Sequence, residues 1–355
     1  MYVFKVLLLL LMSFRLSETA RYSDQLKLVS YLFNNSRYDR RFRPVINLDS
    51  LTELSVHVDS GNSIEILEES QIMKTDVWLT MKWSDALLKW NSSNYGGLSQ
   101  IRLKVSDVWY PDMAIKFAVG KSKLFSDDFN VIITYDGTVE IVIMTDLKVR
   151  CILDIMKFPF DEQSCVFYLS ALNANRQELL ITNSTVGVKD VGGGQWKILS
   201  IKSAKFLVSN IDMLNVTINV KRHPSFYIIY IVVPLIATAQ INPVVFLIPP
   251  NSGEKVSTAV TILLSYSVYL NIISSVLPQT SDSISILSLY IASVLVLSGI
   301  YTFLCVLIVR LSTIENEKST NIRKIPPSLI DLICFIIFTI LITAFTISIL
   351  MFICF

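Results

Sequence analysis

The fold is decided by residues 252–275, which read SGEKVSTAVTILLSYSVYLNIISS. The stretch is about as long as a bilayer span, yet hydroxyl side chains and an asparagine occur throughout it. A helix that faces only lipid has no use for these polar groups, so we expect this one to meet water. At 3.6 residues per turn, one face of the helix starts hydroxylated and ends apolar, and it carries Ser257, Thr261, Leu264, Val268 and Ile272.

A face of this kind suits a helix that lines an ion pore, because rings of acidic side chains select cations and apolar constrictions can gate by dewetting. In a symmetric oligomer, Glu254 would form the selecting ring at one mouth, and Leu264 with Val268 would form the gate. The predicted pore lining is Glu254, Ser257, Thr261, Leu264, Val268, Ile272 and Ser275. The alternative interpretation is a hydroxyl-rich helix buried in a bundle, where serines and threonines pack against neighbouring helices.

The two halves of this chain differ in composition. The 355 residues are 52% hydrophobic and 17% charged, but the charged and turn-rich sequence precedes Arg222 and four apolar blocks follow it. Each block is long enough to cross a bilayer, and the four predicted helices cover residues 226–248, 256–277, 284–309 and 329–353. The net charge of +2, without a basic patch that holds interleaved aromatics, predicts no nucleic-acid partner.

The order of these segments predicts a topology. Residues 1–20 have the lysine, the leucine run and the small residues of a secretory signal peptide. We therefore expect residues 21–222 to be extracellular and residues 223–355 to form a transmembrane domain of four helices. Both termini would then lie outside the cell. The short link of residues 310–327 is expected to be cytoplasmic, in agreement with the positive-inside rule.

Only two of the five cysteines, Cys151 and Cys165, lie in the first half of the chain. In an oxidising compartment they most simply form a disulfide, which in a chain-entropy estimate contributes roughly 3 kcal/mol of stability. The only histidines are His57 and His223, and there is no Cys-x-x-Cys or His-x-x-x-His pattern. The sequence therefore predicts no metal site and no cofactor, and it offers no residues for an enzyme's active site.

The first half also has the periodicity of a β protein. An amphipathic pattern predicts one short helix over residues 24–34, and Asp136-Gly137 predicts a tight hairpin. Alternating residues predict strands over residues 47–58, 64–83, 101–105, 131–135, 138–143, 165–172, 178–182, 195–207 and 213–220. Short strands at such intervals indicate an immunoglobulin-like, all-β sandwich of about ten strands. Glycosylation sequons begin at Asn34, Asn91, Asn183 and Asn215.

The segment between the two cysteines, residues 151–165, reads CILDIMKFPFDEQSC. This spacing and its Phe-Pro-Phe-Asp core resemble the signature of the Cys-loop pentameric ligand-gated ion channels, most closely the nicotinic acetylcholine receptor-like, cation-selective branch. Further matching stretches are YDRRFRPV (38–45), VWL (77–79), WSD (83–85), KWN (89–91), VWYPD (108–112), RHP (222–224) and SGEK (252–255). The resemblance implies a pentamer in the plasma membrane, with four further subunits, whose second helices line the pore.

The same resemblance assigns roles to individual residues. Glu254 takes the position of the cation-selecting glutamate, and Leu264 takes that of the central gate leucine. Coupling between the sandwich and the pore is assigned to the turn near residues 59–61 and to Phe158, Pro159, Phe160, Arg222 and Pro278. The alternatives are that Arg222 is a surface base at the membrane boundary and that Phe158 and Phe160 only pack in the core.

Ligand sites of this branch surround a cationic amine with aromatic faces, and here the aromatic cage is largely missing. Trp78 matches its family counterpart, but Lys116 and Leu172 stand where two aromatic residues are expected. The pocket candidates are Trp78, Lys116, Leu172, Phe206, Ile141 and Ile143. We therefore expect that acetylcholine and similar amines do not bind in the usual way, and the sequence does not identify the small extracellular ligand. Two functions stay open, a ligand-gated cation channel and a non-conducting or accessory subunit of a heteromeric receptor.

Overall fold

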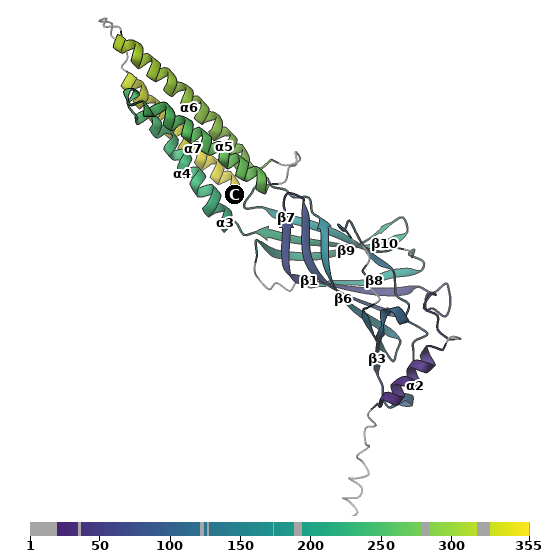
Figure 1. Cartoon of the computed structure of the whole chain (residues 1–355). Helices are drawn as coiled ribbons and strands as arrows, with labels where there is room; N and C mark the ends of the chain where they lie inside the picture. Colours follow the sequence, from purple (N-terminus) through teal and green to yellow (C-terminus); the bar gives the residue numbers. More distant parts are fainter. Residues whose placement is uncertain are drawn as a thin grey trace, which may run out of the picture.

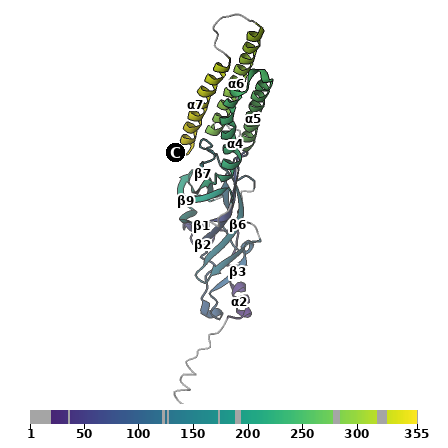
Figure 2. The ribbon, with the colours of Figure 1, turned by 90° about the vertical axis from the view of Figure 1, so that its left-hand side faces the viewer.

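The computed structural model describes residues 20–34, 37–120, 124–125, 128–172, 174–187, 194–277, 284–317 and 327–354. A β-sandwich and a helix bundle follow one another along one long axis, and helix α2 (Tyr22–Leu32) lies at the end of the sandwich farthest from the bundle (Figure 1). The view turned by 90° shows the same elongated shape (Figure 2). The predicted signal peptide lies outside the described residues except for Ala20.

The sandwich consists of two sheets. Within the described ranges the sheets hold ten strands, which confirms the predicted all-β sandwich. The first sheet has the order β3 (Gln100–Lys104), β5 (Asn130–Thr134), β6 (Thr138–Arg150), β2 (Ile72–Ser84), β1 (Thr52–Leu67) and β8 (Leu179–Gly187). The second has the order β4 (Met113–Lys116), β7 (Glu162–Ala171), β10 (Ile211–Arg222) and β9 (Trp196–Val208). Neighbouring strands are antiparallel except β1 and β8, which are parallel.

Buried and more exposed side chains alternate along the strands, which explains why the two sheets pack face to face. In β2, every second side chain is buried, including Met73, Val77, Leu79 and Trp83, whereas Trp78 points outward. A period of two places successive side chains on opposite faces of a sheet. Each large apolar side chain that is fully buried in this way stabilises the sandwich by about 1.5–3 kcal/mol.

At two of the predicted strands, a turn accounts for the difference between prediction and structure. The strand predicted over residues 47–58 begins only at Thr52, because residues 47–50 form a turn. The run predicted over residues 64–83 is the end of β1 followed by β2, with a turn over residues 68–71 between them. The turn was missed because apolar residues flank it on both sides and no glycine or proline marks it.

Among the residues that the structure describes, the helix bundle contains four helical segments that are long and apolar enough to cross a membrane. Three of them are continuous, namely α5 (Glu254–Val276), α6 (Ile286–Glu317) and α7 (Pro327–Cys354). Helix α6 continues eight residues beyond the predicted end at residue 309, so the link predicted over residues 310–327 begins as helix. The remaining short helices are η1 (Ser92–Tyr95), η2 (Val105–Asp107) and η5 (Pro250–Ser252).

The first apolar block is one membrane-length segment whose helical pitch changes along its length. It comprises α3 (Ser225–Tyr227), the π-helix η3 (Ile228–Val232), α4 (Val233–Ile241) and the 3₁₀ segment η4 (Asn242–Leu247). Pro234 and Pro243 lie at two of these changes. Proline has no amide hydrogen with which to continue the α-helical ladder, so it interrupts the regular pitch.

Candidate permeation and coupling site

Helix α5 presents the predicted pore-lining face to the outside of the chain. All seven predicted side chains are exposed, and Leu264 in the middle of the stripe is 60% exposed. The opposite face is buried against the other helices through Lys255, Ala259, Tyr266 and Ile273. One helix is thus divided into a packed side and a side that no other part of the described chain covers.

The hydroxyl groups on the exposed face are already oriented by the helix itself. The Thr261 hydroxyl donates to the Ser257 carbonyl at 2.9 Å, and the Ser265 hydroxyl donates to the Thr261 carbonyl at 3.0 Å. A hydroxyl that has donated its proton still has lone pairs with which to accept. The stripe therefore offers oxygen acceptors in fixed positions, which suits water or cations rather than anions.

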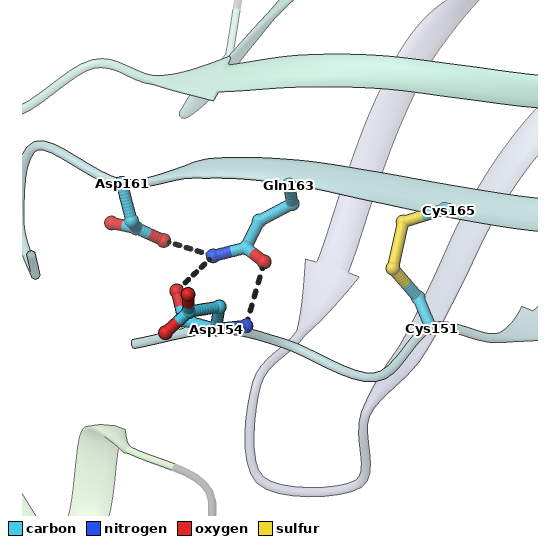
Figure 3. The surroundings of a disulfide bond; sticks show 5 residues. All are labelled: Cys151, Asp154, Asp161, Gln163 and Cys165. Carbon is cyan, nitrogen blue, oxygen red and sulfur yellow. Dashed lines mark hydrogen bonds between the residues drawn. A yellow bond between two sulfur atoms is a disulfide. The ribbon is translucent and has the colours of Figure 1, made fainter. Parts of the chain in front are cut away.

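The loop between β6 and β7 is closed by the disulfide that the sequence predicts, Cys151–Cys165. Gln163 holds the loop from inside: its carbonyl oxygen accepts from the Asp154 amide at 2.9 Å, and its amide donates to the Asp161 carboxylate at 2.6 Å (Figure 3). Gln163 and Asp161 are both buried. The disulfide and these hydrogen bonds fix the loop, which lies at the end of the sandwich next to the bundle.

Arg222, the last residue of β10, gathers the elements at the junction of sandwich and bundle. Its Nε donates to Asp161 Oδ1 at 2.8 Å and its Nη1 to Glu68 Oε1 at 2.7 Å, and its guanidinium carbon lies 4.2 Å from the ring centroid of Trp196. Burial disfavours the charged guanidinium, but the bonds and charges of Asp161 and Glu68 outweigh burial and raise the pKa of Arg222. The alternative of a surface base is wrong, because Arg222 is 1% exposed.

The loop between Cys151 and Cys165, called the Cys-loop below, packs its aromatic residues directly on the membrane helices. Phe158 is fully buried, and its ring meets that of Tyr227 at 4.9 Å between centroids. Pro159 and Phe160 line an apolar cavity together with residues of the first, third and fourth membrane segments. The Ile286 amide at the start of α6 donates to the Met156 carbonyl at 3.1 Å. Loop and bundle are therefore in contact through both side chains and backbone.

Two of the predicted coupling positions were not found where they were expected: one lies inside a strand, and the other lies outside the described residues. The turn predicted near residues 59–61 lies inside strand β1, and the turn that reaches Arg222 is the one that begins with Glu68. Strand β1 is 16 residues long and has a register shift between Ser60 and Ile64, which places its end later than expected. Pro278 lies outside the described residues.

The candidate ligand residues are divided between the two faces of the sandwich. Trp78 is exposed on β2 of the six-stranded sheet. Lys116 ends β4 and Phe206 lies in β9 of the four-stranded sheet, and Leu172 directly follows β7. Because the outer faces of the two sheets point in opposite directions, Trp78 and the other candidates would meet only across a contact between neighbouring subunits.

The prediction that Ile141 and Ile143 line a ligand pocket is wrong. Both side chains are buried between the sheets, because every second residue of β6 points into the core. A shift of one residue reverses the face of a strand. The outward-facing residues of this part of β6 are Val142 and Met144, and Met144 lies opposite Trp78 on β2.

An aromatic group that the sequence analysis missed lies on the four-stranded sheet. The Tyr168 ring contacts the rings of Phe117 and Phe206, each at 5.6 Å between centroids. Lys116 pairs with Tyr168 across β4 and β7. No sequence motif predicts this aromatic group, because the group forms only when four strands that are far apart in the sequence pair in one sheet.

The structure also places the candidate modification sites. Asn183 is exposed on β8, the Asn91 side chain accepts a hydrogen bond from the Ser93 amide at 3.1 Å, and the Asn215 side chain accepts one from Thr217. The sequon that begins at Asn34 continues into residues outside the described ranges. Glycosylation stays a prediction at these positions. Within the described part of the chain, no group of three His, Cys, Asp or Glu residues is arranged to hold a metal ion.

Two family models match this chain. The model described as the neurotransmitter-gated ion-channel ligand binding domain matches residues 25–224, and the model described as the neurotransmitter-gated ion-channel transmembrane region matches residues 231–326. The chain belongs to the neurotransmitter-gated ion-channel family. The resemblance to Cys-loop, nicotinic acetylcholine receptor-like channels is thereby confirmed. A member of this family is a multi-pass protein of the plasma membrane, with its ligand-binding domain outside the cell.

The chain is also similar to curated members of the neurotransmitter-gated ion-channel family. It is 29% identical to the neuronal acetylcholine receptor subunit beta-2 of Gallus gallus over 311 residues, which are 85% of this chain and 62% of that relative. It is 30% identical to the beta-2 subunit of Carassius auratus over 285 residues, 78% of this chain and 62% of the relative. It is 29% identical to the neuronal acetylcholine receptor subunit beta-4 of Bos taurus over 289 residues, which are 79% of this chain and 58% of that relative. The chain therefore spans less than two thirds of the length of these relatives.

Proposed function

We propose that this chain is one subunit of a pentameric cation channel, whose pore is lined by five copies of α5 and which opens when a small ligand binds outside the cell. The observation that carries the proposal is the division of α5 into a buried side and an exposed stripe of seven predicted pore residues. The other partners are the bilayer, four further subunits and the permeant cations. The division between an extracellular part (residues 21–222) and a membrane part (residues 223–355) belongs to the same proposal.

In this proposal Glu254 selects the permeating ion. Its carboxylate is exposed at the end of α5 that lies farthest from the sandwich (Figure 1). Five such carboxylates around one axis would raise the local concentration of cations and repel anions. Sodium and potassium ions would pass, and chloride would not.

The proposed gate is the apolar part of the same stripe, Leu264 and Val268. Both side chains are exposed in the single chain, so in a ring of five copies they would face one another and exclude water. Ligand binding would move the sandwich, and the contact layer of Arg222, the Cys-loop and the start of α6 would carry that movement to α5.

The experiment expresses this chain alone in oocytes and compares Leu264→Ser with Leu263→Ser. A hydroxyl at the gate hydrates the constriction, so we expect Leu264→Ser to produce a standing current whose reversal potential follows sodium. Leu263 is half-buried on a different face, and Leu263→Ser should produce no such current. A reversal potential that follows chloride, or unchanged selectivity in Glu254→Ala, would contradict the proposal.

A second candidate function is favoured by the changed ligand positions. Lys116 and Leu172 replace aromatic faces, so this chain is poorly suited to hold a cationic amine by cation–π contact. The chain would then serve as a non-conducting or accessory subunit in a heteromeric receptor. A Leu264→Ser variant that reaches the cell surface and assembles, yet stays electrically silent, would favour this second function over the first.

We infer further that acetylcholine is not the ligand. Phe117, Tyr168 and Phe206 supply an aromatic surface near Lys116, but this surface differs in position from the cage that the family resemblance implies. A screen of small ligands on the Leu264→Ser background identifies the agonist. A current evoked by acetylcholine at micromolar concentration and abolished by Trp78→Ala would overturn this inference.

A further inference from the structure

Two of the charged residues that sit inside the apolar helix bundle are paired with each other. Lys255 is 1% exposed on the packed side of α5, and its ammonium Nζ lies 2.5 Å from Oδ1 of Asp331, which is also buried. Asp331 is the only charged residue in the sequence of α7, a helix of 28 residues. A single carboxylate in an apolar membrane helix is costly unless it has a partner, so it marks a functional role.

The surroundings of the ammonium satisfy it completely. Besides Asp331, Lys255 Nζ donates to the carbonyl oxygens of Ile248 at 3.1 Å and Phe246 at 3.3 Å. A lysine has three N–H donors, and here three acceptors receive them, two from the end of the first membrane segment and one from α7. The lysine is therefore held on the side of α5 that faces away from the exposed stripe, and its charge is neutralised in place.

Lys255 directly follows Glu254, the proposed selecting carboxylate. Consecutive residues of a helix lie about 100° apart, so two opposite charges share one turn of α5 and point in different directions. If the lysine were released from Asp331, its charge would lie close to the carboxylate ring at the pore mouth. A positive charge at that distance opposes the attraction of cations.

We propose that Asp331 is a specificity-determining residue, which acts from α7 by binding and neutralising Lys255 so that the negative charge of Glu254 dominates the mouth of the pore. This inference rests on the proposed channel function. Asp331 touches no permeating ion and is a positioning residue. Through this ion pair, α7 influences which ion passes along α5. Helix α7 has the smallest buried share of the four membrane segments.

The test measures single-channel sodium conductance and the chloride-to-sodium permeability ratio in the Leu264→Ser background. Asp331→Asn keeps the shape of the side chain and removes its charge, and Asp331→Leu also removes its hydrogen-bonding atoms. We expect each to lower the conductance about twofold or more and to raise the permeability ratio, because the lysine charge is no longer neutralised. The combined variant Lys255→Met with Asp331→Leu contains neither charge and should recover most of the conductance that Asp331→Leu loses.

A matched control removes a different buried contact of α7. The Tyr290 hydroxyl and the Thr346 hydroxyl are 2.9 Å apart and join α6 to α7 near the sandwich end of the bundle. Thr346→Val should leave conductance and permeability ratio unchanged. If Asp331→Asn behaves as the parent, or if the combined variant is no better than Asp331→Leu, Asp331 only docks α7 and the inference is wrong.

Failure of this inference can be told apart from failure of the proposed function. If the Leu264→Ser parent reaches the surface and passes no current, the channel proposal fails and the conductance role of Asp331 fails with it. The melting temperature of the purified protein then decides the remaining claim, that Asp331 neutralises Lys255. We expect Asp331→Leu to melt lowest and the combined variant to melt higher, and equal melting temperatures for these two would overturn that claim as well.

Discussion

Arg222 shows how much one side chain can connect. Its guanidinium binds the turn after β1 through Glu68, the Cys-loop through Asp161, and the first membrane segment through the Tyr227 hydroxyl at 3.3 Å. The motif Arg-His-Pro could be read from the sequence, but the partner Glu68 could not. It became recognisable only once the turn between β1 and β2 was placed, and neither glycine nor proline marks that turn in the sequence.

Removing Arg222 is therefore expected to destabilise the protein strongly. Arg222→Met leaves two carboxylates, of which Asp161 is buried, without their partner, and breaking a buried ion pair in this way costs about 3–5 kcal/mol. We expect a clear fall in the melting temperature of the purified protein and little receptor at the cell surface. Arg41→Met is the matched control, because Arg41 and Asp39 form an ion pair at an exposed site. An equal fall in both variants would contradict a special role for Arg222.

Asp85 provides a test by pH. Its carboxylate is fully buried and accepts hydrogen bonds from the Tyr38 hydroxyl at 2.8 Å and the Leu87 amide at 2.9 Å, yet burial raises its pKa from 3.8 to about 6. A carboxyl group whose pKa is higher in the folded state stabilises the fold when protonated. This contribution is present below pH 4 and is lost as the pH rises towards 6, at roughly 1.4 kcal/mol per unit of pKa shift.

The comparison of wild type with Asp85→Asn isolates this effect, since other carboxyl groups titrate in the same range. We expect the stability advantage of wild type over Asp85→Asn to shrink between pH 4 and pH 6. The measurement is chemical unfolding followed by tryptophan fluorescence at a series of pH values. A stability difference that grows as the pH rises through this range would contradict the assignment.

At the scale of an element, α5 could be predicted almost entirely from the sequence, and the ligand face could not. The period of α5 identifies the exposed stripe because an isolated helix has only one geometry. The face of the sheet to which a strand residue points is harder to predict. The prediction for β6 was wrong by one residue, so it placed the buried Ile141 and Ile143 on a surface that Val142 and Met144 form. Strand β4 was missed because four residues are too few to show alternation.

A cysteine scan of α5 measures its two sides directly. We expect cysteines at Ser257, Thr261, Leu264 and Val268 to react rapidly with a charged, water-soluble thiol reagent, since these side chains are exposed on the stripe. Cysteines at the buried positions Ala259, Tyr266 and Ile273 should stay unreactive. Rates are measured on surface protein in which the native membrane cysteines are replaced by serine. Rapid reaction at the buried positions would show that α5 is rotated relative to this structure.

At the scale of the whole molecule, the sandwich and the bundle meet in one layer. The Cys-loop supplies much of it, because Phe158 packs on Tyr227 and the Met156 carbonyl accepts from Ile286. The sequence predicts this junction through the Phe-Pro-Phe core. The cavity under Pro159 and Phe160, which α7 completes, was not predictable because its walls come from segments nearly 200 residues apart.

We expect the Cys151–Cys165 disulfide to affect assembly as well as the stability of the sandwich. Cys151→Ser combined with Cys165→Ser is expected to destabilise the sandwich by roughly 3 kcal/mol, by the loss of the cross-link in the unfolded chain. Because the same loop contacts the bundle, we also expect less assembled protein, measured by gel filtration in detergent after surface labelling. Cys305→Ser, which changes a buried cysteine of α6 that forms no disulfide, should assemble normally. Normal assembly of the double variant would show that the bundle docks without the cross-link.

The segment from Ser225 to Leu247 changes its helical pitch along its length, and we expect this to affect how movement passes from the sandwich to the bundle. Its π and 3₁₀ portions interrupt the regular α-helical ladder between the end next to Arg222 and Leu247, and such interruptions often mark hinges. The third segment is an unbroken rod of 32 residues, and its first turn is fastened to the Cys-loop. Under the proposed channel function, we therefore expect movement of the sandwich to be transmitted chiefly along α6, whereas the segment from Ser225 to Leu247 would bend at its changes of pitch.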